Sequence, residues 1–263
     1  MTESNGIHET VSTLLGKTKE PVYLLRSSSE LVKIFVEIAT QQESSPIHVL
    51  ATEDVLKDIR SQFPIATRAA ELVTRNRLTL TPTIPDGWGT AVVAGDTGYE
   101  FAHIEDHHLI FETDKIPDGL SDTCEGYRDS SDRFSLRTPP WSTATDTLEV
   151  EFGIDVREDF ATAIETLASL EKPAIDEVTA VLLVGAHNDV LLYDLSHWSE
   201  DIGFYSKASF SRAKRDLEDE GILYSEKVPT EVGRPRLRLT LADEYDSLPV
   251  SELLREINTR RSD

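Results

Sequence analysis

Three histidines and an aspartate near the middle of the chain carry side chains that can bind a metal ion. His103 lies just before the triplet Asp106-His107-His108. Imidazole and carboxylate groups at such short spacing are suitable ligands for Zn²⁺ and other transition metals. The same residues also fit a polar turn between two short strands. We favour the turn and expect no metal site.

The triplet also resembles the Asp-His-His motif of phosphoesterases. Two-metal chemistry needs further carboxylate clusters, and the sequence has none in recognisable form nearby. No phosphate-binding loop of the G-x-x-x-x-G-K-[ST] type or strand-linked G-x-G-x-x-G type occurs. Cys124, the single cysteine, lies in a polar stretch, and we interpret it as an incidental thiol rather than a redox sensor. We expect no catalytic residue and no cofactor.

The basic residues gather in one segment of an otherwise acidic chain. The whole chain has 26 basic and 48 acidic residues, a formal charge of −22. Residues 204–241 hold eight basic and six acidic residues, so this segment is net +2 and the remainder is net −24. A solvated face without a partner has no reason to reverse the background charge. The reversal indicates a surface for DNA phosphates.

Within this segment, residues 207–220 have the pattern of a helix capped by Ser206 and ended by Gly221. The first half of this helix is basic, and its acidic residues come afterwards. Such a distribution suits a recognition helix whose N-terminal half enters the major groove. From this helix we expect DNA contacts by Lys207, Ser209, Ser211, Arg212, Lys214 and Arg215.

Two strands after the helix predict a wing. Residues 222–228 and 234–241 flank a turn at 229–233. Leucines alternate with polar residues along the second strand, and a period of two directs the leucines to the core. We expect wing contacts to the minor groove or to phosphates by Arg234, Arg236 and Arg238.

The preceding residues complete a winged helix-turn-helix. Residues 176–187 have an apolar helical pattern, and 195–201 predict a short helix with Asp194 as its N-cap. Gly203 suits the tight turn that follows. We expect Trp198, on the short helix, in the core rather than beside the DNA backbone. The order of helix, short helix, turn, long helix and hairpin is that of a winged helix-turn-helix.

The N-terminal part alternates strands and helices. Apolar strand patterns at 21–25, 46–51 and 78–80 enclose helical patterns, which predicts a parallel layer. The helix predicted over 53–77 is interrupted near Pro64. A meander of short strands follows at 90–94, 99–104 and 108–112. We expect an α/β or α+β domain with a three-layer-like arrangement of sheet and helices.

The middle of the chain is harder to assign. Residues 114–146 are polar and predict a loosely ordered excursion with one or two short elements, and 147–152 predict a returning strand. Residues 155–170 predict a connector helix whose apolar stripe can pair with a second copy. The expected domains are an N-terminal dimerisation or sensor domain at 1–152, a connector helix at 153–173, the winged helix-turn-helix at 174–245 and a C-terminal helix or tail at 246–263.

Composition limits the environment of the protein. No apolar run reaches the roughly 20 residues of a membrane helix, and the N-terminus has no signal-peptide pattern. One cysteine excludes a disulfide framework. We therefore expect a cytoplasmic protein without a membrane partner. The 9 lysines against 17 arginines, with abundant acids, are typical of an extreme halophile, in which molar salt screens charge repulsion.

The C-terminal segment is similar to winged-helix repressors of bacteria and archaea. The similarity runs from Leu195-Ser196-His197-Trp198-Ser199-Glu200-Asp201-Ile202-Gly203 through Gly221-Ile222-Leu223 to Gly233-Arg234-Pro235-Arg236. Over its whole length the chain resembles the haloarchaeal regulator family called TbsP. This resemblance implies a dimeric transcription factor, linked to the sugar-responsive regulator TrmB and to control of central carbon metabolism. It implies no effector site at the level of residues.

We therefore predict a sequence-specific transcription regulator that binds double-stranded DNA as a homodimer, with a second transcription regulator as a further candidate partner. One alternative is a ligand-binding or enzymatic N-terminal module to which the winged helix is an appendage. The absence of a convergent acid–base set in the sequence argues against the enzyme. Another alternative is an adaptor that docks on a second DNA-bound regulator.

Overall fold

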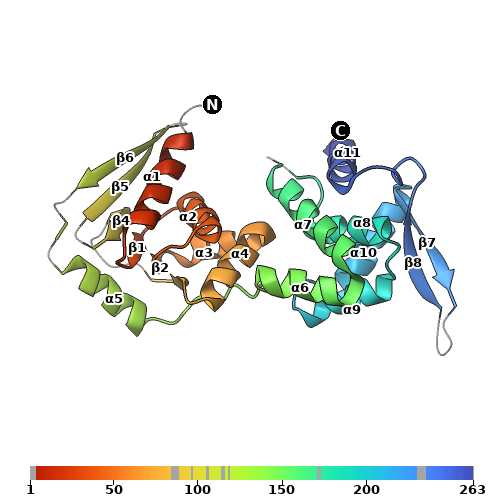
Figure 1. Cartoon of the computed structure of the whole chain (residues 1–263), viewed down its shortest axis with the longest axis horizontal. Coiled ribbons are helices and arrows are strands. Elements are labelled where there is room, and N and C mark those ends of the chain that lie inside the picture. Colours follow the sequence, from red (N-terminus) through yellow and green to blue (C-terminus); the bar gives the residue numbers. More distant parts are fainter. Residues whose placement is uncertain are drawn as a thin grey trace. The chain divides into compact units, whose positions relative to one another are not determined.

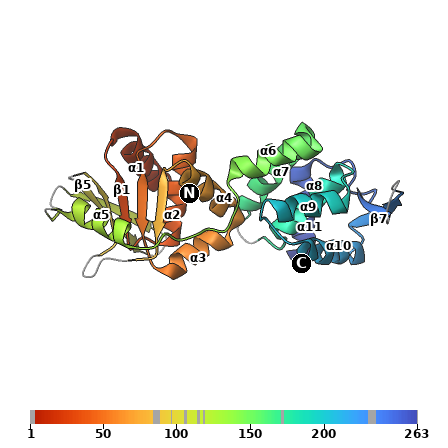
Figure 2. The same ribbon diagram turned by 90° about the horizontal axis from the view of Figure 1, so that it is seen from below.

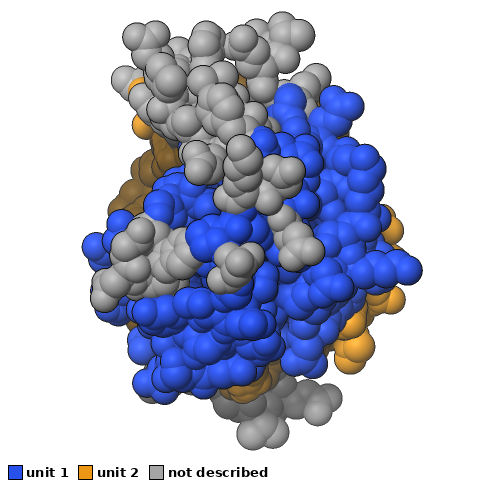
Figure 3. Space-filling view, turned by 90° about the vertical axis from the view of Figure 1, so that its left-hand side faces the viewer, with its two compact units in different colours: residues 1–140 blue, residues 141–263 orange. Residues whose placement is uncertain are grey.

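The computed structural model describes residues 4–83, 89–95, 97–104, 107–113, 116–117, 119–170, 173–229 and 235–262. For residues 4–5, 100–104 and 107–111 it describes the backbone alone. Contacts within the chain divide it into two compact units, residues 1–140 and 141–263, which Figure 3 distinguishes by colour. Within the described ranges, no helix combines the length and the apolar character needed to cross a membrane.

A six-stranded sheet forms the centre of unit 1 (Figure 1). Its strands lie in the order β3-β2-β1-β4-β5-β6. The first three in sequence are parallel, whereas β4 pairs antiparallel with β1 and continues into an antiparallel meander. The parallel layer and the meander are the ones that the sequence predicts. The strands are β1 (Val22–Leu25), β2 (Ile47–Leu50), β3 (Leu78–Thr81), β4 (Ala91–Ala94), β5 (Thr97–Ile104) and β6 (His107–Thr113).

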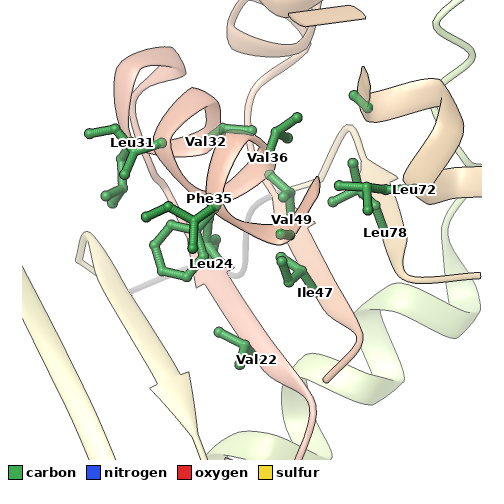
Figure 4. Packing of buried hydrophobic residues seen from close by; sticks show 14 of the residues in the cluster. Val22, Leu24, Leu31, Val32, Phe35, Val36, Ile47, Val49, Leu72 and Leu78 are labelled. Carbon is green, nitrogen blue, oxygen red and sulfur yellow. The ribbon is translucent and has the colours of Figure 1, made fainter. Parts of the chain in front are cut away.

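Four helices supply the larger core of unit 1. Leucine, isoleucine and valine side chains of these helices pack on one face of the sheet. Phe35 of α2 lies over Leu24 and the neighbouring strand residues, with Val32 and Val36 beside it (Figure 4). Alternate residues of a strand point to the same face, so Val22 and Leu24 belong to this core. The helices are α1 (Ser4–Lys17), α2 (Ser29–Gln41), α3 (Glu53–Ser61) and α4 (Phe63–Thr74).

The opposite face of the sheet carries a smaller core. Tyr23 and Leu25 of β1 pack there with Leu120 and Cys124 of α5 (Leu120–Ser130). Figure 1 shows α5 on the side of the sheet away from α1 and α2. Helices on both faces make the expected three-layer arrangement. The polar stretch at 114–146 thus contains one helix that covers the sheet and the start of a second helix.

The strand expected at 147–152 is wrong, because these residues end the helix α6 (Trp141–Phe152). Ala144 and Leu148 are four residues apart and both buried, which is helical rather than strand periodicity. Thr147 donates a hydrogen bond from its hydroxyl to the carbonyl of Thr143, at 2.6 Å. The hydroxyl of this β-branched residue thus finds its acceptor within the helix. The division between the units therefore falls before α6, whereas the sequence suggested a boundary at 152.

The expected connector helix is α7 (Ile154–Ala168), and its apolar stripe is not available to a second copy. Phe160, Ile164 and Leu167 are buried inside unit 2, where α7 packs against α6, α8 and α11. The sequence could not distinguish these two uses, since an apolar stripe looks the same whether its partner lies in the same chain or in another.

The remaining elements of unit 2 form the winged helix-turn-helix. Helices α8, α9 and α10 lie together beside the β7–β8 hairpin (Figure 2). An isolated antiparallel β-bridge joins Leu191, just before α9, to Arg238 of the hairpin. The bounds are α8 (Glu177–His187), α9 (Leu192–Asp201), α10 (Lys207–Asp219), β7 (Leu223–Val228), β8 (Arg236–Leu241) and α11 (Val250–Ser262).

Candidate nucleic-acid interface

Helix α10 is held with one face outward. Ser206 caps it, since its hydroxyl accepts a hydrogen bond from the amide of Ser209, and Gly221 ends it at a φ of +70°. Phe210 and Leu217 are completely buried beneath it. The helical period leaves the opposite face in solvent. The exposed residues of the helix are Ala208, Ser211, Arg212, Arg215, Asp216 and Asp219, with both aspartates in its second half.

Arg212 and Arg215 are the uncommitted cations of this face. Both side chains are exposed, and among the described residues neither has an ion-pair partner. They lie three residues apart, so they are neighbours on the same side of the helix. A guanidinium can donate two hydrogen bonds to a guanine edge or to a phosphate. Both positions agree with the sequence-based expectation for the recognition helix.

Lys207, at the start of α10, is already paired. Its ammonium lies 2.7 Å from the Glu200 carboxylate at the end of α9. The hydrogen bond from Lys207 lowers the pKa of Glu200, and the same bond raises the pKa of Lys207. The two side chains are 41% and 48% exposed, so the pair is a surface contact that water and salt can break. A phosphate that contacts Lys207 competes with Glu200 for the N–H donors of its ammonium group.

Lys214 is directed toward the wing rather than outward. Its ammonium lies 2.7 Å from Glu218 and 3.4 Å from the Ser225 hydroxyl of β7. Ser225 in turn donates a hydrogen bond to Glu218. Burial opposes the ionisation of Glu218, but the hydrogen bonds from Lys214 and Ser225 outweigh it and lower the pKa of this carboxyl. With a side chain only 16% exposed, Lys214 joins α10 to the wing in the free protein.

The two serines differ in their positions. Ser209 is partly buried, and its hydroxyl lies 3.1 Å from that of Ser206 at the helix start. Ser211 is exposed and donates its hydroxyl to the carbonyl of Lys207. Ser211 therefore shares the outward face with Arg212 and Arg215, whereas Ser209 is part of the cap.

Arg236, on the wing strand β8, is held by α9. Its guanidinium lies 2.7 Å from Asp194 and 4.5 Å from the ring centre of Tyr193. The sequence-based role of Asp194 as an N-cap is wrong, because α9 begins one turn earlier, after Leu191. The pairing of Leu191 with β8 sets that earlier start, and Asp194 then faces Arg236.

The structure gives less support to the other two wing arginines as DNA contacts. Arg238 lies between Leu191 and Glu226 in the small sheet, and its Nε is buried without a hydrogen-bond partner among the described residues. Arg234, expected at the wing tip, lies outside the described residues.

Lys227 is a candidate contact that our sequence analysis did not select. Side chains alternate along β7, so Lys227 shares a strand face with Leu223 and with Ser225, which contacts α10. Lys227 is exposed and has no ion pair among the described residues. The signal was present in the sequence, because Leu223 identifies the inward face and a period of two places Lys227 on the α10 side.

Close packing behind the helices fixes this surface. A Cβ on Gly185 of α8 would lie 2.6 Å from Leu195 of α9 and 3.4 Å from Leu239 of β8, so any larger residue would displace the buried Leu195 side chain. Trp198 is buried, as expected, and donates its indole hydrogen to Thr147 at 2.9 Å. The core residues thereby set the position of α9 relative to the hairpin.

Helix α11 supports the far end of α10. Arg261 makes two hydrogen bonds to the carboxylate of Glu220, and Arg260 donates to the Glu220 carbonyl at 2.7 Å. Positive charge is favourable at a helix C-terminus, where carbonyl groups lack partners. The acidic end of α10 is partly neutralised within the protein.

The histidine cluster and Cys124 have less structural support as functional sites. In the meander, His103 lies opposite His108, and His107 begins β6, so the two histidines of the triplet are strand residues rather than turn residues. Asp106 lies outside the described residues. A search of the described part of the chain finds no group of three or more potential metal ligands. Cys124 is buried, and burial raises the pKa of its thiol to about 11.

Comparison with known proteins gives two matches that together span nearly the whole chain. Residues 2–139 match the family model described as "Transcriptional regulator TbsP-like, N-terminal". Residues 140–258 match "Transcriptional regulator TbsP-like, C-terminal HTH domain". The boundary between the matches coincides with the division between the two compact units. No curated protein and no solved structure matches the chain.

Proposed function

We propose, since the chain belongs to the TbsP-like transcriptional regulators, that it reads DNA with the exposed face of α10. The observation that carries this proposal is the pair Arg212 and Arg215, exposed on the recognition helix and free of ion pairs among the described residues. In a helix-turn-helix protein the corresponding helix enters the major groove, where arginine distinguishes guanine from the other bases.

The remaining cations divide into two groups in this proposal. Lys227 contacts the phosphate backbone directly, because it faces the α10 side of the wing and is unpaired among the described residues. Lys207 and Arg236 reach phosphates after release from Glu200 and Asp194. Lys214 and Arg238 position the wing. Ser211 contributes a short-range hydrogen bond beside Arg212.

Unit 1 is the dimerisation or sensor domain in this proposal. Two winged helices related by a two-fold axis can read two half-sites, which is the usual arrangement of helix-turn-helix regulators. The family resemblance supports promoters of central carbon metabolism genes as targets, in a halophilic archaeon, with a second regulator as a further partner. The acid excess of 48 against 26 basic residues supports the halophilic host.

The experiment that tests the DNA role is a genome-wide pull-down of crosslinked DNA with the tagged protein. The variant Arg212→Ala/Arg215→Ala is compared with Arg157→Ala/Arg255→Ala, which removes the same charge from α7 and α11 of the same unit. We expect discrete promoter peaks that disappear in the first variant and remain in the second.

Two results overturn the proposal. Peaks that remain after loss of Arg212 and Arg215 show that the protein reaches promoters through another DNA-bound regulator, as an adaptor does. No peaks with the unaltered protein direct attention to a ligand or a reaction in unit 1. Circular dichroism of each variant establishes that a lost peak reflects lost contacts rather than unfolding.

A further inference from the structure

The two edges of the unit 1 sheet differ in whether another segment of the chain forms hydrogen bonds with them. At the β3 edge, a later segment of the chain lies beside the strand, and the amide of Phe134 in this segment donates to the carbonyl of Leu80 at 2.8 Å. The hydroxyl of Thr83 donates to Ser131 beside it. At the other edge, no strand among the described residues pairs with the outer side of β6. An open edge is a row of unpaired backbone donors and acceptors, which natural proteins usually cover or interrupt.

The strands at the open edge extend beyond the rest of the sheet. β4 pairs with β5 only from Thr97 to Tyr99. β5 and β6 remain paired with each other as far as Ile104 and His107, without a bulge in their register. This outer part is a two-stranded ribbon, and such ribbons are at best marginally stable alone in water. β6 also lacks the lysine or proline that commonly protects an edge strand.

We propose that β6 pairs antiparallel with β6 of a second copy of this chain and so joins two unit 1 sheets into one. This inference deepens the dimer of the proposed function and rests on it for its biological role. The apolar stripe of α7 is not a competing dimer surface, because Phe160, Ile164 and Leu167 are buried within unit 2.

The register of this pairing follows from the β5–β6 ladder. Residues along an antiparallel strand alternate between directing their backbone groups to one neighbour and to the other. The amides of Val22 and Arg26 donate to Pro46 and Leu50 on the β2 side, so Tyr23 directs its backbone groups to Val93 of β4. Carried through the registers of β4, β5 and β6, this alternation directs the backbone groups of His107 inward, toward Ile104. Those of His108, Ile110 and Glu112 then point outward, and a two-fold axis at Ile110 satisfies all three residues at once.

The side chains suit this register. With Ile110 opposite its own copy, His108 lies opposite the partner's Glu112, and Leu109 lies opposite the partner's Phe111. The same contacts occur twice because the interface is two-fold symmetric. An imidazole opposite a carboxylate and two apolar residues opposite each other are favourable cross-strand pairs. Glu112 is exposed in the single chain and is available for such a pair.

The decisive experiment is a charge reversal with rescue, followed by sedimentation equilibrium of the full chain. His108→Glu places two carboxylates opposite each other at two positions, and we expect the dimer dissociation constant to rise roughly tenfold. Adding Glu112→Lys to His108→Glu restores opposite charges and is expected to restore the dimer. Unchanged mass distributions in both variants, or failure of the double variant to recover, overturn the pairing.

A backbone variant provides an independent test. Ile110→Pro removes an outward amide without removing an inward hydrogen bond, whereas Ile110→Val keeps the amide and the strand preference. We expect a monomer of the 29.4 kDa chain for Ile110→Pro and a dimer for Ile110→Val. A dimer in both cases overturns the proposal, as does a monomer of the unaltered protein.

The failure of this inference is distinguishable from failure of the proposed function. Fluorescence anisotropy with a single half-site duplex measures α10 without requiring a dimer. If the Ile110→Pro monomer still binds the half-site and loses affinity for the paired half-sites, both proposals hold. If the unaltered protein binds DNA as a dimer and Ile110→Pro does not alter its mass, the DNA role stands and the β6 pairing falls.

Discussion

At the residue scale, intramolecular carboxylates decide which basic residues are available for DNA. Three cations that the sequence assigns to the DNA surface each lie 2.7 Å from a carboxylate of the same unit. Such carboxylates occupy the positions that phosphate oxygens would take. The available charge is thereby concentrated on Arg212, Arg215 and Lys227. In an acidic protein this arrangement limits non-specific attraction to DNA.

Replacement of Glu200 by glutamine is expected to strengthen DNA binding. The Glu200→Gln change removes the ion pair that holds Lys207, so Lys207 can contact phosphate without breaking a salt bridge. An exposed pair is worth up to about 1 kcal/mol, which corresponds to an affinity gain of roughly two- to fivefold. Fluorescence anisotropy at fixed salt measures the change.

The control for Glu200 is Asp246→Asn. Asp246 is exposed in the same unit and has no ion pair among the described residues, so its replacement removes the same charge without releasing a lysine. If Asp246→Asn strengthens binding as much as Glu200→Gln does, the gain is a general charge effect and Lys207 is not restrained by Glu200.

His48 makes the stability of unit 1 depend on pH. Burial, followed by the positive charge of Arg128, lowers the pKa of His48 from 6.5 to about 4. The folded state therefore binds a proton less readily than the unfolded state. The resulting contribution, roughly 3 kcal/mol at most, is complete above pH 6.5 and is lost as the pH falls toward 4.

The pH effect is measured against His48→Gln, which does not titrate. Urea unfolding at pH 7.5 and pH 5 gives the free energy of unfolding of both proteins. We expect the unaltered protein to lose more stability than His48→Gln between these values. Equal losses would mean that other groups are responsible and that His48 accepts a proton in the folded state.

At the element scale, helix and strand identity follow the sequence where the apolar period is clear. The strands of unit 1, the interruption between α3 and α4 at Pro64 and the capping of α10 by Ser206 all agree with sequence-based expectation. The exceptions occur where local preference and tertiary contacts conflict. α6 is rich in threonine and would favour a strand, yet burial of Ala144 and Leu148 on one side makes it a helix.

A glycine pair tests the packing of these elements. Gly185→Ala is expected to destabilise unit 2 by about 1–3 kcal/mol, because the new methyl group would lie 2.6 Å from Leu195. Gly126→Ala, in α5, adds a methyl group with nothing within 4 Å and is expected to stabilise unit 1 by roughly 0.5–1 kcal/mol.

Urea unfolding followed by circular dichroism compares the two glycine variants, and in a Trp88→Phe background the fluorescence of Trp141 and Trp198 reports on unit 2. A stable Gly185→Ala protein with normal DNA affinity would show that α8, α9 and β8 can separate to accommodate a side chain. In that case the close approach of α8, α9 and β8 would not determine the position of the wing.

At the scale of the whole molecule, a local basic surface acts within an acidic chain. Residues 204–241 are net +2, whereas the rest of the chain is net −24 and gives the whole its charge of −22. Long-range attraction to DNA is therefore weak, and recognition depends on short-range contacts by few residues. The two compact units allow the DNA-reading part and the sheet to fold as separate cores.

Salt dependence is expected to differ from that of basic DNA-binding proteins. Release of counterions from DNA normally weakens binding steeply as salt rises. For this acidic chain we expect cations that bridge protein carboxylates to phosphates to be taken up on binding, which gives a shallow or reversed slope at molar KCl. Fluorescence anisotropy titrations at a series of KCl concentrations measure how DNA affinity depends on salt. A steep conventional fall, with binding lost at a few tenths molar, contradicts this prediction.

The sequence by itself determined the secondary structure of most elements, the winged helix-turn-helix and the exposed face of α10. These depend on local periodicity and on capping residues, which are readable in one chain. Only the tertiary structure decided that Lys207 and Arg236 are paired with carboxylates of α9 and that α7 is internal. The pairs of Lys207 with Glu200 and of Arg236 with Asp194 join residues from different elements, so they depend on how those elements pack, which spacing along the chain does not encode. The pair of Lys214 with Glu218 is different, because it lies within α10 at a spacing of four residues.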